Sequence, residues 1–232
     1  MWKVFPYVQL IVQFQIPNER DKQLMQKYKV LGIEPGKGYS KNIFSEKQWN
    51  AIEAGAAAAR GEIEASTRES NGIDGWATSP VNSGRWGDDY MTRATVAWQY
   101  IYVNTLEEAV YYTGYYDAQN ERLDASANDY TLTFPAGAIP HAEFFWSVTM
   151  YNKSGFLVDN AIDRYCLSSR SGLATEPDGS TVMHIQKNNP GGIAESNWLP
   201  APNDQFYLVF RIYGPDQNAI SGNYRLPGIE KN

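Results

Sequence analysis

Five runs of β-branched and aromatic residues follow residue 107, and no helical pattern separates them. Each run is bounded by Gly, Pro, Asn or Asp, which are the residues that end strands in turns. Strands that follow one another without intervening helices favour an antiparallel sandwich over a parallel α/β sheet. The pattern therefore predicts an antiparallel, jelly-roll-like β-sandwich with helices on one side. The runs are Glu108–Tyr116, Tyr130–Phe134, Glu143–Tyr151, Thr181–Gln186 and Phe206–Tyr213.

The first third of the chain has the period of helices instead. Ser45 and Gln48 form a capping-box pattern, in which the hydroxyl accepts from the N3 amide and the glutamine reaches back. Apolar residues then recur at spacings of three and four, which predicts a helix ending near Thr67. Its alanines at positions 56–59 would allow close packing against a sheet. Two shorter helices are predicted over Asn18–Tyr28 and Asp89–Val103.

The expected class is therefore α+β, mainly β with a helical N-terminal part. Residues 1–75 are predicted to form a helical lead-in subdomain packed on the sandwich, and residues 76–232 the sandwich itself. Together they make one domain, long enough to bury a sizeable core. Gly114, inside the first strand run, predicts a bulge or a close approach of another part of the chain.

The chain is acidic, with a formal net charge of -6 at pH 7. Nucleic acids and anionic membranes are bound by clustered Lys and Arg, and the sequence has no basic run. No stretch approaches the roughly 18 to 20 apolar residues that a membrane span needs. We therefore expect a soluble protein with no nucleic-acid partner and no membrane span. The first 14 residues lack a small-residue cleavage site, so no signal peptide is predicted and the compartment stays undetermined.

The most specialised loop runs from Pro190 to Pro202. Its three prolines fix φ and remove backbone donors, while Gly191 and Gly192 allow angles that other residues avoid. No regular helix or strand is expected there. Because a strongly strand-like run follows, we expect the loop to close over a site.

Seven blocks of the sequence stand in a distinctive order: Leu31–Gly36, Gly84–Ala94, Tyr130–Pro135, Phe145–Tyr151, Asn160–Tyr165, Asp178–Ser180 and Glu195–Pro202. With these blocks the chain resembles the domain of unknown function 1214, over roughly residues 17–227. The resemblance implies a jelly-roll-like sandwich with a helical lead-in, and it brings no established activity. In that family a second uncharacterised domain, numbered 1254, often precedes this one. We expect that domain to be missing here, so a function formed between the halves would be absent or supplied by another chain.

Metal binding has one weak indication. His141 and Glu143 share a strand face, so both could reach one ion, with His184 and Asp178 or Glu195 as further ligands. The family resemblance implies an uncharged turn at the first two positions, from which this chain departs. An exposed turn position for His141 and a sheet-surface position for His184 are the favoured interpretation, so no metal is predicted.

Nucleophilic and cofactor chemistry have little support. Ser147 lies inside an apolar strand rather than on a strained turn, and no nucleophile-elbow motif occurs. The single Cys166 forbids an internal disulfide and is interpreted as a small buried thiol. The glycines of residues 32–38 do not follow a strand in a βαβ unit, so no nucleotide cofactor is predicted.

Three arginines lie near aromatic residues in the sequence, namely Arg93, Arg164 and Arg211. If Arg211 faces the core it must be paired, because a lone buried charge costs several kcal/mol. Asp163 or Glu195 is the expected partner. Such a network would tie the block Asn160–Tyr165 to the loop at 190–202.

The same arginines could instead bind a ligand beside Trp198 and Asn197. The parallel N–H donors of a guanidinium suit a carboxylate, a phosphate or the hydroxyls of a sugar. Both readings predict that the block Asn160–Tyr165 meets the loop. Only the second predicts an open cleft.

Three functions follow as hypotheses. The first is a small-molecule binding domain for a polar ligand, a carbohydrate or a carboxylate. The second is a hydrolase that uses Glu195 with Asp88 or Asp89. The third is an assembly module that mates with a partner domain or with a second copy to form a homo-oligomer. Whether the protein is an enzyme stays open. The predicted ligand pocket consists of Tyr90, Arg93, Trp146, Asn160, Arg164, Glu195, Asn197 and Trp198.

Overall fold

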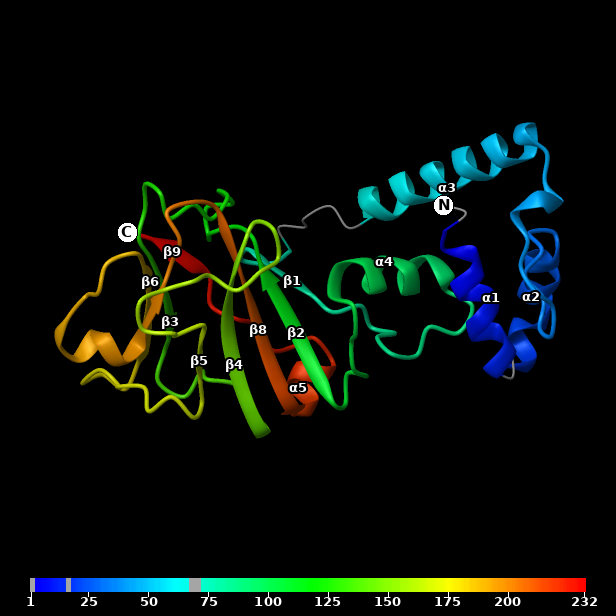
Figure 1. Ribbon diagram of the computed structural model, residues 1–232. Coiled ribbons are helices and arrows are strands. Elements are labelled where there is room, and N and C mark those ends of the chain that lie inside the picture. Colours follow the sequence, from blue (N-terminus) through cyan, green and yellow to red (C-terminus); the bar gives the residue numbers. More distant parts are fainter. Residues whose placement is uncertain (1–2, 16–17, 67–71) are drawn as a thin grey trace. The chain divides into compact units, whose positions relative to one another are not determined.

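A computed structural model describes residues 3–15, 18–66 and 72–232 (Figure 1). The chain divides into two compact units, one of helices and one that contains both sheets. The predicted α+β class is therefore confirmed. Unit 1 comprises Met1–Thr67 and Gly87–Trp98, and unit 2 comprises Arg68–Trp86 and Gln99–Asn232. The predicted domain division at residues 75 and 76 stays a proposal.

The helices of unit 1 include both short helices that the sequence predicts. A further helix, α1, was not predicted; its Pro6 lies in the first turn, where the missing N–H would have no partner. The last two residues of α4 belong to unit 2. The helices are α1 (Phe5–Phe14), α2 (Lys22–Lys29), α3 (Glu46–Ser66) and α4 (Tyr90–Tyr100), with 3-10 turns η1 (Glu19–Asp21) and η2 (Lys41–Ile43).

The capping box of α3 is present. The backbone N–H of Gln48 donates to Ser45 Oγ over 3.4 Å, and Gln48 Oε1 accepts from the backbone N–H of Ser45 over 2.9 Å. The helix ends at Ser66, next to the predicted end at Thr67. None of its residues is buried, so the expected burial of its alanines against a sheet is not observed. Alanine has too little side chain to cover an apolar stripe by itself.

The core of unit 1 is small. Phe5, Ile33 and Val96 are its buried apolar residues within the described ranges 3–15, 18–66 and 87–98. Gln9 is also buried, and its side-chain amide binds the turn after α2: its Oε1 accepts from the backbone N–H of Glu34 over 2.8 Å. A buried amide with backbone partners fixes the position of α1 against this turn.

Unit 2 contains a five-stranded antiparallel sheet with strand order β1-β2-β8-β4-β5. The long strand β8 lies between β2 and β4 and pairs with both along most of its length (Figure 1). Gly114 of β2 stands opposite Trp76 of β1, and a Cβ at this glycine would lie 2.9 Å from the indole ring. The predicted close approach is therefore confirmed. The strands are β1 (Trp76–Thr78), β2 (Ala109–Gly114), β4 (Ala142–Asn152), β5 (Cys166–Ser168) and β8 (Phe206–Pro215).

The second sheet has four strands in the order β7-β6-β3-β9. Three of them pair antiparallel, whereas the edge strand β7 pairs parallel to β6, against the expectation of a wholly antiparallel sheet. β7 belongs to the proline-rich loop, where no strand was expected. An edge strand tolerates Pro200 because one side of it needs no partner. The strands are β3 (Tyr130–Phe134), β6 (Thr181–Gln186), β7 (Trp198–Pro200) and β9 (Ile229–Lys231), and the 3-10 turn η3 (Gly192–Asn197) precedes β7.

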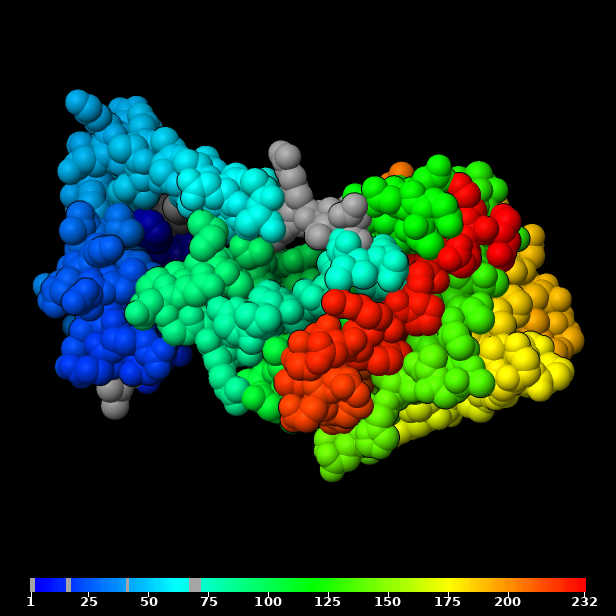
Figure 2. Space-filling view, turned by 180° about the vertical axis from the view of Figure 1, so that it is seen from behind, coloured from blue at the N-terminus to red at the C-terminus, as the bar shows by residue number. Residues whose placement is uncertain are grey.

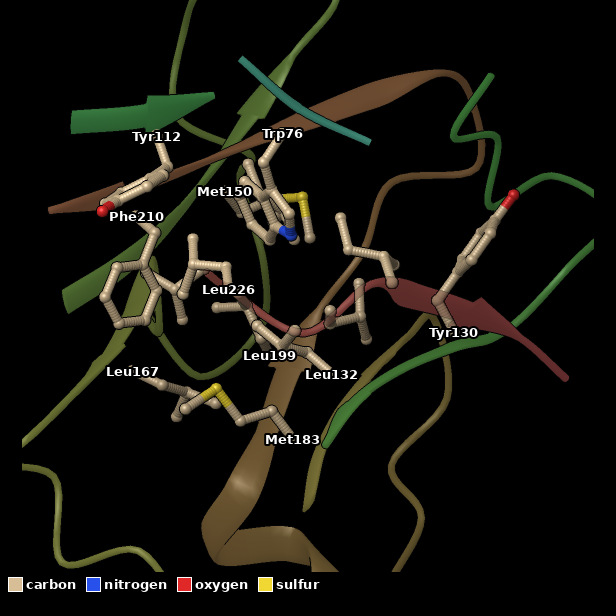
Figure 3. Packing of buried hydrophobic residues seen from close by; sticks show 14 of the residues in the cluster. Trp76, Tyr112, Tyr130, Leu132, Met150, Leu167, Met183, Leu199, Phe210 and Leu226 are labelled. Atoms are coloured by element: carbon tan, nitrogen blue, oxygen red, sulfur yellow. The ribbon is translucent and has the colours of Figure 1, made fainter. Parts of the chain in front are cut away.

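Side chains of the two sheets meet in one core (Figure 3). Trp146 and Phe210 of the five-stranded sheet stack with ring centroids 5.4 Å apart, and Phe134 of the other sheet lies 5.9 Å from Phe210. Leu132 and Met183 from the four-stranded sheet are fully buried. The two sheets thus form a sandwich, while the jelly-roll connection of its strands stays a prediction.

The last segment of the chain, after β8, contacts both sheets of the sandwich. After β8 it forms the short helix α5 (Gln217–Ile220) and then runs to β9, and in Figure 2 this red segment follows the surface of unit 2 as a continuous strip. Leu226 is buried, and the carbonyl of Pro227 accepts a 2.8 Å hydrogen bond from Trp76 Nε1. The segment before β9 is therefore hydrogen-bonded to β1, an edge strand of the five-stranded sheet.

Candidate functional site

The outer face of the five-stranded sheet carries an unusual set of polar aromatic residues. Along β8 the even-numbered residues from Phe206 to Ile212 point into the core. The odd-numbered residues point outward because side chains alternate along a strand. The register places Arg211 between Tyr111 of β2 and Ser147 of β4. Four residue pairs further along, Tyr207 lies opposite Tyr151 of β4.

These outward residues line a cavity of about 310 Å³ within unit 2, which we call the tyrosine cavity. Its floor comes from strands β2, β4 and β8, and one wall comes from residues 99–103. Seven of its lining residues are tyrosines. The lining residues are Gln99, Tyr100, Ile101, Tyr102, Val103, Tyr111, Thr113, Tyr115, Tyr151, Gly155, Tyr207, Val209, Arg211 and Tyr213.

Arg211 is the one cation among these lining residues, and it is half-buried. Its Nη1 donates to Thr149 Oγ1 over 2.9 Å, and its Nη2 donates to the hydroxyl of Tyr151 over 2.7 Å. Both acceptors are neutral. In the described part of the chain no carboxylate forms an ion pair with Arg211. Asp163 or Glu195 was expected as a partner only if Arg211 faced the core, and β8 instead turns this side chain to the outer face.

The phenols around Arg211 are held in their neutral form. Burial raises the pKa of Tyr111 and that of Tyr207 to about 12 each. Burial also raises the pKa of Tyr100 and of Tyr115. Loss of water disfavours a phenolate, so at neutral pH each of these hydroxyls keeps its proton and is able both to donate and to accept a hydrogen bond.

The rings themselves are ordered by mutual contacts. Tyr207 lies between Tyr115, at 5.0 Å between centroids, and Tyr151, which it stacks at 5.3 Å. Tyr111 meets Tyr213 edge-to-face at 6.4 Å, and Asn104 Nδ2 donates to the Tyr111 hydroxyl over 2.9 Å. These contacts hold the ring faces in place before any ligand arrives.

The wall at residues 99–103 contains a strained turn. Ile101 has a φ of 63°, in the left-handed region that β-branched residues strongly avoid. The N–H of Tyr102 donates to the carbonyl of Tyr100 over 2.7 Å, which closes the chain tightly just after α4. Such strain persists where surrounding structure imposes it, and it concentrates at functional sites.

Several residues of the predicted pocket serve to join two loops. Nη1 of Arg164 donates to the backbone carbonyls of Glu195, over 2.6 Å, and of Trp198, over 2.9 Å. The predicted meeting of the block Asn160–Tyr165 with the proline-rich loop is therefore confirmed. The partners are backbone oxygens, however, and not the expected carboxylates. Glu195 itself is exposed.

The neighbouring asparagines organise backbone. Asn160 Nδ2 donates to the carbonyls of Val158 and Arg164, both over 3.0 Å. Asn197 is buried; its Oδ1 accepts from the N–H of Ala174, and its Nδ2 donates to the carbonyls of Ala174 and Val182. With all their polar atoms used in this way, neither side chain presents a free group to a ligand.

Two aromatic residues of the predicted set are buried. Trp198 is 8% exposed, and its Nε1 donates to the carbonyl of Gln186 over 2.8 Å. Trp146 belongs to the core and also borders a separate cavity of about 360 Å³. The other residues that line it are Ile139, Ser168, Ser169, Gly172, Leu173, Thr175 and Thr181.

The last two predicted residues, Tyr90 and Arg93, belong to unit 1. They border a cavity of about 740 Å³ between α1, α2 and α4. The hydroxyl of Tyr90 donates to Asp21 Oδ1 over 3.0 Å, and this hydrogen bond raises the pKa of Tyr90. The predicted set thus divides among the loop junction, the core and this cavity.

The other candidate chemistries gain no support from the geometry. Asp88 and Asp89 belong to unit 1, whereas Glu195 belongs to unit 2, and Asp89 Oδ1 accepts from the N–H of Thr92 as a helix cap. Cys166 is exposed on the short strand β5, so its interpretation as a buried thiol was wrong. Within residues 3–15, 18–66 and 72–232, no three His, Cys, Asp or Glu residues gather as metal ligands. In the same ranges, no helix has both the length and the apolar character to cross a membrane.

The tyrosine cavity could be found only in part from the sequence. The surplus of tyrosine and the alternation along Phe206–Tyr213 are signals for a sheet face of this kind. Neither signal tells which strands lie beside β8. The cavity depends on outward-facing side chains of three neighbouring strands, β2, β8 and β4.

Comparisons with known proteins support the family that the sequence resembles. Residues 108–217 match the model of the family described as Protein of unknown function (DUF1214). The crystal structure of the VPA0106 protein from Vibrio parahaemolyticus is 25% identical, with a TM-score of 0.63 over 92% of this chain and 51% of that chain. This chain thus spans about half the length of that protein.

An uncharacterized protein from Burkholderia cenocepacia is 14% identical, with a TM-score of 0.43 over 70% of this chain and 36% of that chain. No curated protein matches the chain.

Proposed function

We propose that the protein binds a small anionic ligand in the tyrosine cavity. The three-stranded floor of this cavity lies within residues 108–217, the part of the chain that matches DUF1214, a family of unknown function. The observation that carries the proposal is the state of Arg211. A half-buried guanidinium faces a cavity, and its bonded partners are neutral hydroxyls. A charge that is partly removed from water is stabilised by an anion.

The cavity has the other properties of a ligand site. Its volume of about 310 Å³ lies at the lower end of the range of roughly 300 to 1,000 Å³ that is usual for small-molecule pockets. Seven of its fourteen lining residues are tyrosines, whose rings supply apolar surface and whose hydroxyls supply polar groups. As predicted from the sequence, the proposed pocket is lined by aromatic residues and an arginine. Its residues and its position in the fold differ from those that were predicted.

Thermal unfolding of the full chain tests the proposal. We expect organic acids to raise the midpoint of wild type, because a ligand at about one hundred times its dissociation constant stabilises by roughly 2.7 kcal/mol. Arg211→Gln should abolish this shift. Arg85→Gln is the matched control, since Arg85 is exposed and pairs with Glu107 outside the cavity. If no anion shifts wild type, or if both variants respond equally, the proposal is wrong.

One observation supports a second function, assembly with another copy of the chain. Five large apolar residues on or beside α1 are more than half exposed: Val4, Tyr7, Leu10, Ile11 and Phe14. An apolar helix face of this kind supports the assembly hypothesis, with a second copy as the partner. Light scattering at high protein concentration should then show a dimer, which the double variant Leu10→Gln, Phe14→Gln converts to a monomer. A monomeric wild type would contradict it.

A further inference from the structure

We infer that the ligand of the tyrosine cavity is a planar aromatic monocarboxylate. The inference rests on the proposed function and adds the class of ligand. It is carried by three properties of the cavity: the number of its charges, the remaining donors of Arg211 and the row of ordered aromatic rings in its lining.

The charge of the lining favours a single negative charge on the ligand. Arg211 is the one charged residue among the fourteen that line the cavity. Two further arginines lie over aromatic rings of unit 2, but neither is a lining residue of the cavity. Arg122 lies 5.1 Å from the ring centroid of Tyr115, and Arg170 lies 4.9 Å from that of Phe145 outside the lining. A dianion would therefore bring one charge more than the lining neutralises, and a neutral sugar would leave Arg211 without a counter-charge.

The guanidinium has donors left for a carboxylate. Nη1 and Nη2 each carry two hydrogens, and the structure assigns one of each to Thr149 and Tyr151. A guanidinium is planar, and two neighbouring N–H groups of it match the two oxygens of a carboxylate. The hydroxyls of Thr149 and Tyr151 hold this fork in one orientation, so little rotamer freedom is lost when a ligand binds.

The rings favour a flat body behind the carboxylate. Tyr115, Tyr207 and Tyr151 form a row of ring contacts with spacings of 5.0 and 5.3 Å. Arg211 lies at one end of this row, 5.7 Å from the ring centroid of Tyr151. An aromatic ring can add to the row by offset or edge-to-face contact, which is worth about 0.5 to 1.5 kcal/mol beyond the burial of its area. A saturated ring of the same size gains only the burial.

Calorimetric titration of the full chain tests the inference with four probes: benzoate, cyclohexanecarboxylate, inorganic phosphate and glucose. We expect benzoate to bind about three- to tenfold more tightly than cyclohexanecarboxylate, because the two differ mainly in their π-faces. Phosphate and glucose should bind more weakly than either. Tyr207→Leu should reduce the preference for benzoate, whereas Arg211→Gln should weaken both carboxylates.

The outcomes separate the inference from the proposed function. Equal binding of the two carboxylates, or tighter binding of phosphate, would overturn the inference that the ligand is an aromatic monocarboxylate. The proposed anion site would still stand. Tightest binding of glucose, or no binding of any anion, overturns both. Tyr207→Phe, which keeps the ring, is the matched variant and should keep the preference for benzoate over cyclohexanecarboxylate. If Tyr207→Leu fails to fold, the comparison of the four probes on wild type still decides.

Discussion

At the scale of single residues, unit 2 uses buried polar side chains mainly to hold its loops. Asn197 shows this best, because all its hydrogen-bonding partners but one are backbone groups of other segments. Arg164 does the same from the other side of the junction. The residues that look most suited to a ligand in the sequence are therefore the ones that the fold itself occupies.

Replacement of Asn197 by alanine should be costly. The change leaves the N–H and the carbonyl of Ala174 and the carbonyl of Val182 without partners in a buried place. We expect a loss of about 2 to 4 kcal/mol in the free energy of unfolding, measured by urea denaturation. Asn188→Ala is the control, since Asn188 is exposed and contributes its backbone carbonyl to the bond from Gln186. Equal stability of the two variants would contradict a bracing role for Asn197.

The tyrosines predict a loss of stability at alkaline pH. Burial raises the pKa of Tyr111, Tyr112 and Tyr207 to about 12, above the pKa of 10.0 of a free phenol. Above the unfolded pKa the unfolded chain releases these protons while the folded chain keeps them. Their contribution is therefore full below pH 10 and is lost as pH rises from 10 toward 12.

Tyrosinate absorbance checks this expectation. Tyr111, Tyr112 and Tyr207 should form tyrosinate only together with unfolding. A single titration near the free pKa in a protein that remains folded would show that the tyrosine cavity is hydrated.

At the scale of the elements, the length of a strand decides how well the sequence predicts it. β3 and β6 begin and end where their alternating runs do, and β2, β4 and β8 differ by a few residues. The four missed strands β1, β5, β7 and β9 have three residues each, too few to show a period of two. Each of them forms by pairing with the unpaired edge of a longer strand. Such pairing depends on the tertiary structure and not on the local sequence. For the same reason the rows of the tyrosine cavity could not be predicted.

Gly114 offers a test of packing between neighbouring elements. A Cβ there would lie 2.9 Å from the ring of Trp76 and 3.0 Å from Ile229. Because both neighbours are buried, neither can move away easily. We expect Gly114→Ala to destabilise by about 1 to 3 kcal/mol, measured by thermal or urea unfolding.

Gly55→Ala is the matched control in α3. No atom lies within 4 Å of its added Cβ, and a helical glycine costs about 0.5 to 1 kcal/mol relative to alanine. This variant should therefore be as stable as wild type or more so. A stable Gly114→Ala would mean that the sheet and the C-terminal strip can separate at little cost.

At the scale of the whole molecule, the two units differ in how much core they have. The core cluster of unit 2 contains residues from both of its sheets, whereas α2 and α3 have no buried residue. Backbone amides open more readily where few apolar contacts oppose it. Hydrogen exchange should thus be fast in α2 and α3 and slow in β2, β4 and β8. Uniform protection of all five elements would show that unit 1 has support beyond its own core.

The chain passes between the units three times, because Gly87–Trp98 returns to unit 1 between two parts of unit 2. Neither unit can therefore be produced as one uninterrupted segment of the sequence. A protease that cuts near Val81, which is 91% exposed, would leave each fragment with a share of both units. The two fragments should stay together on a sizing column in native buffer and part only in denaturant. The folded protein would thus survive a broken backbone as a complex of its own pieces.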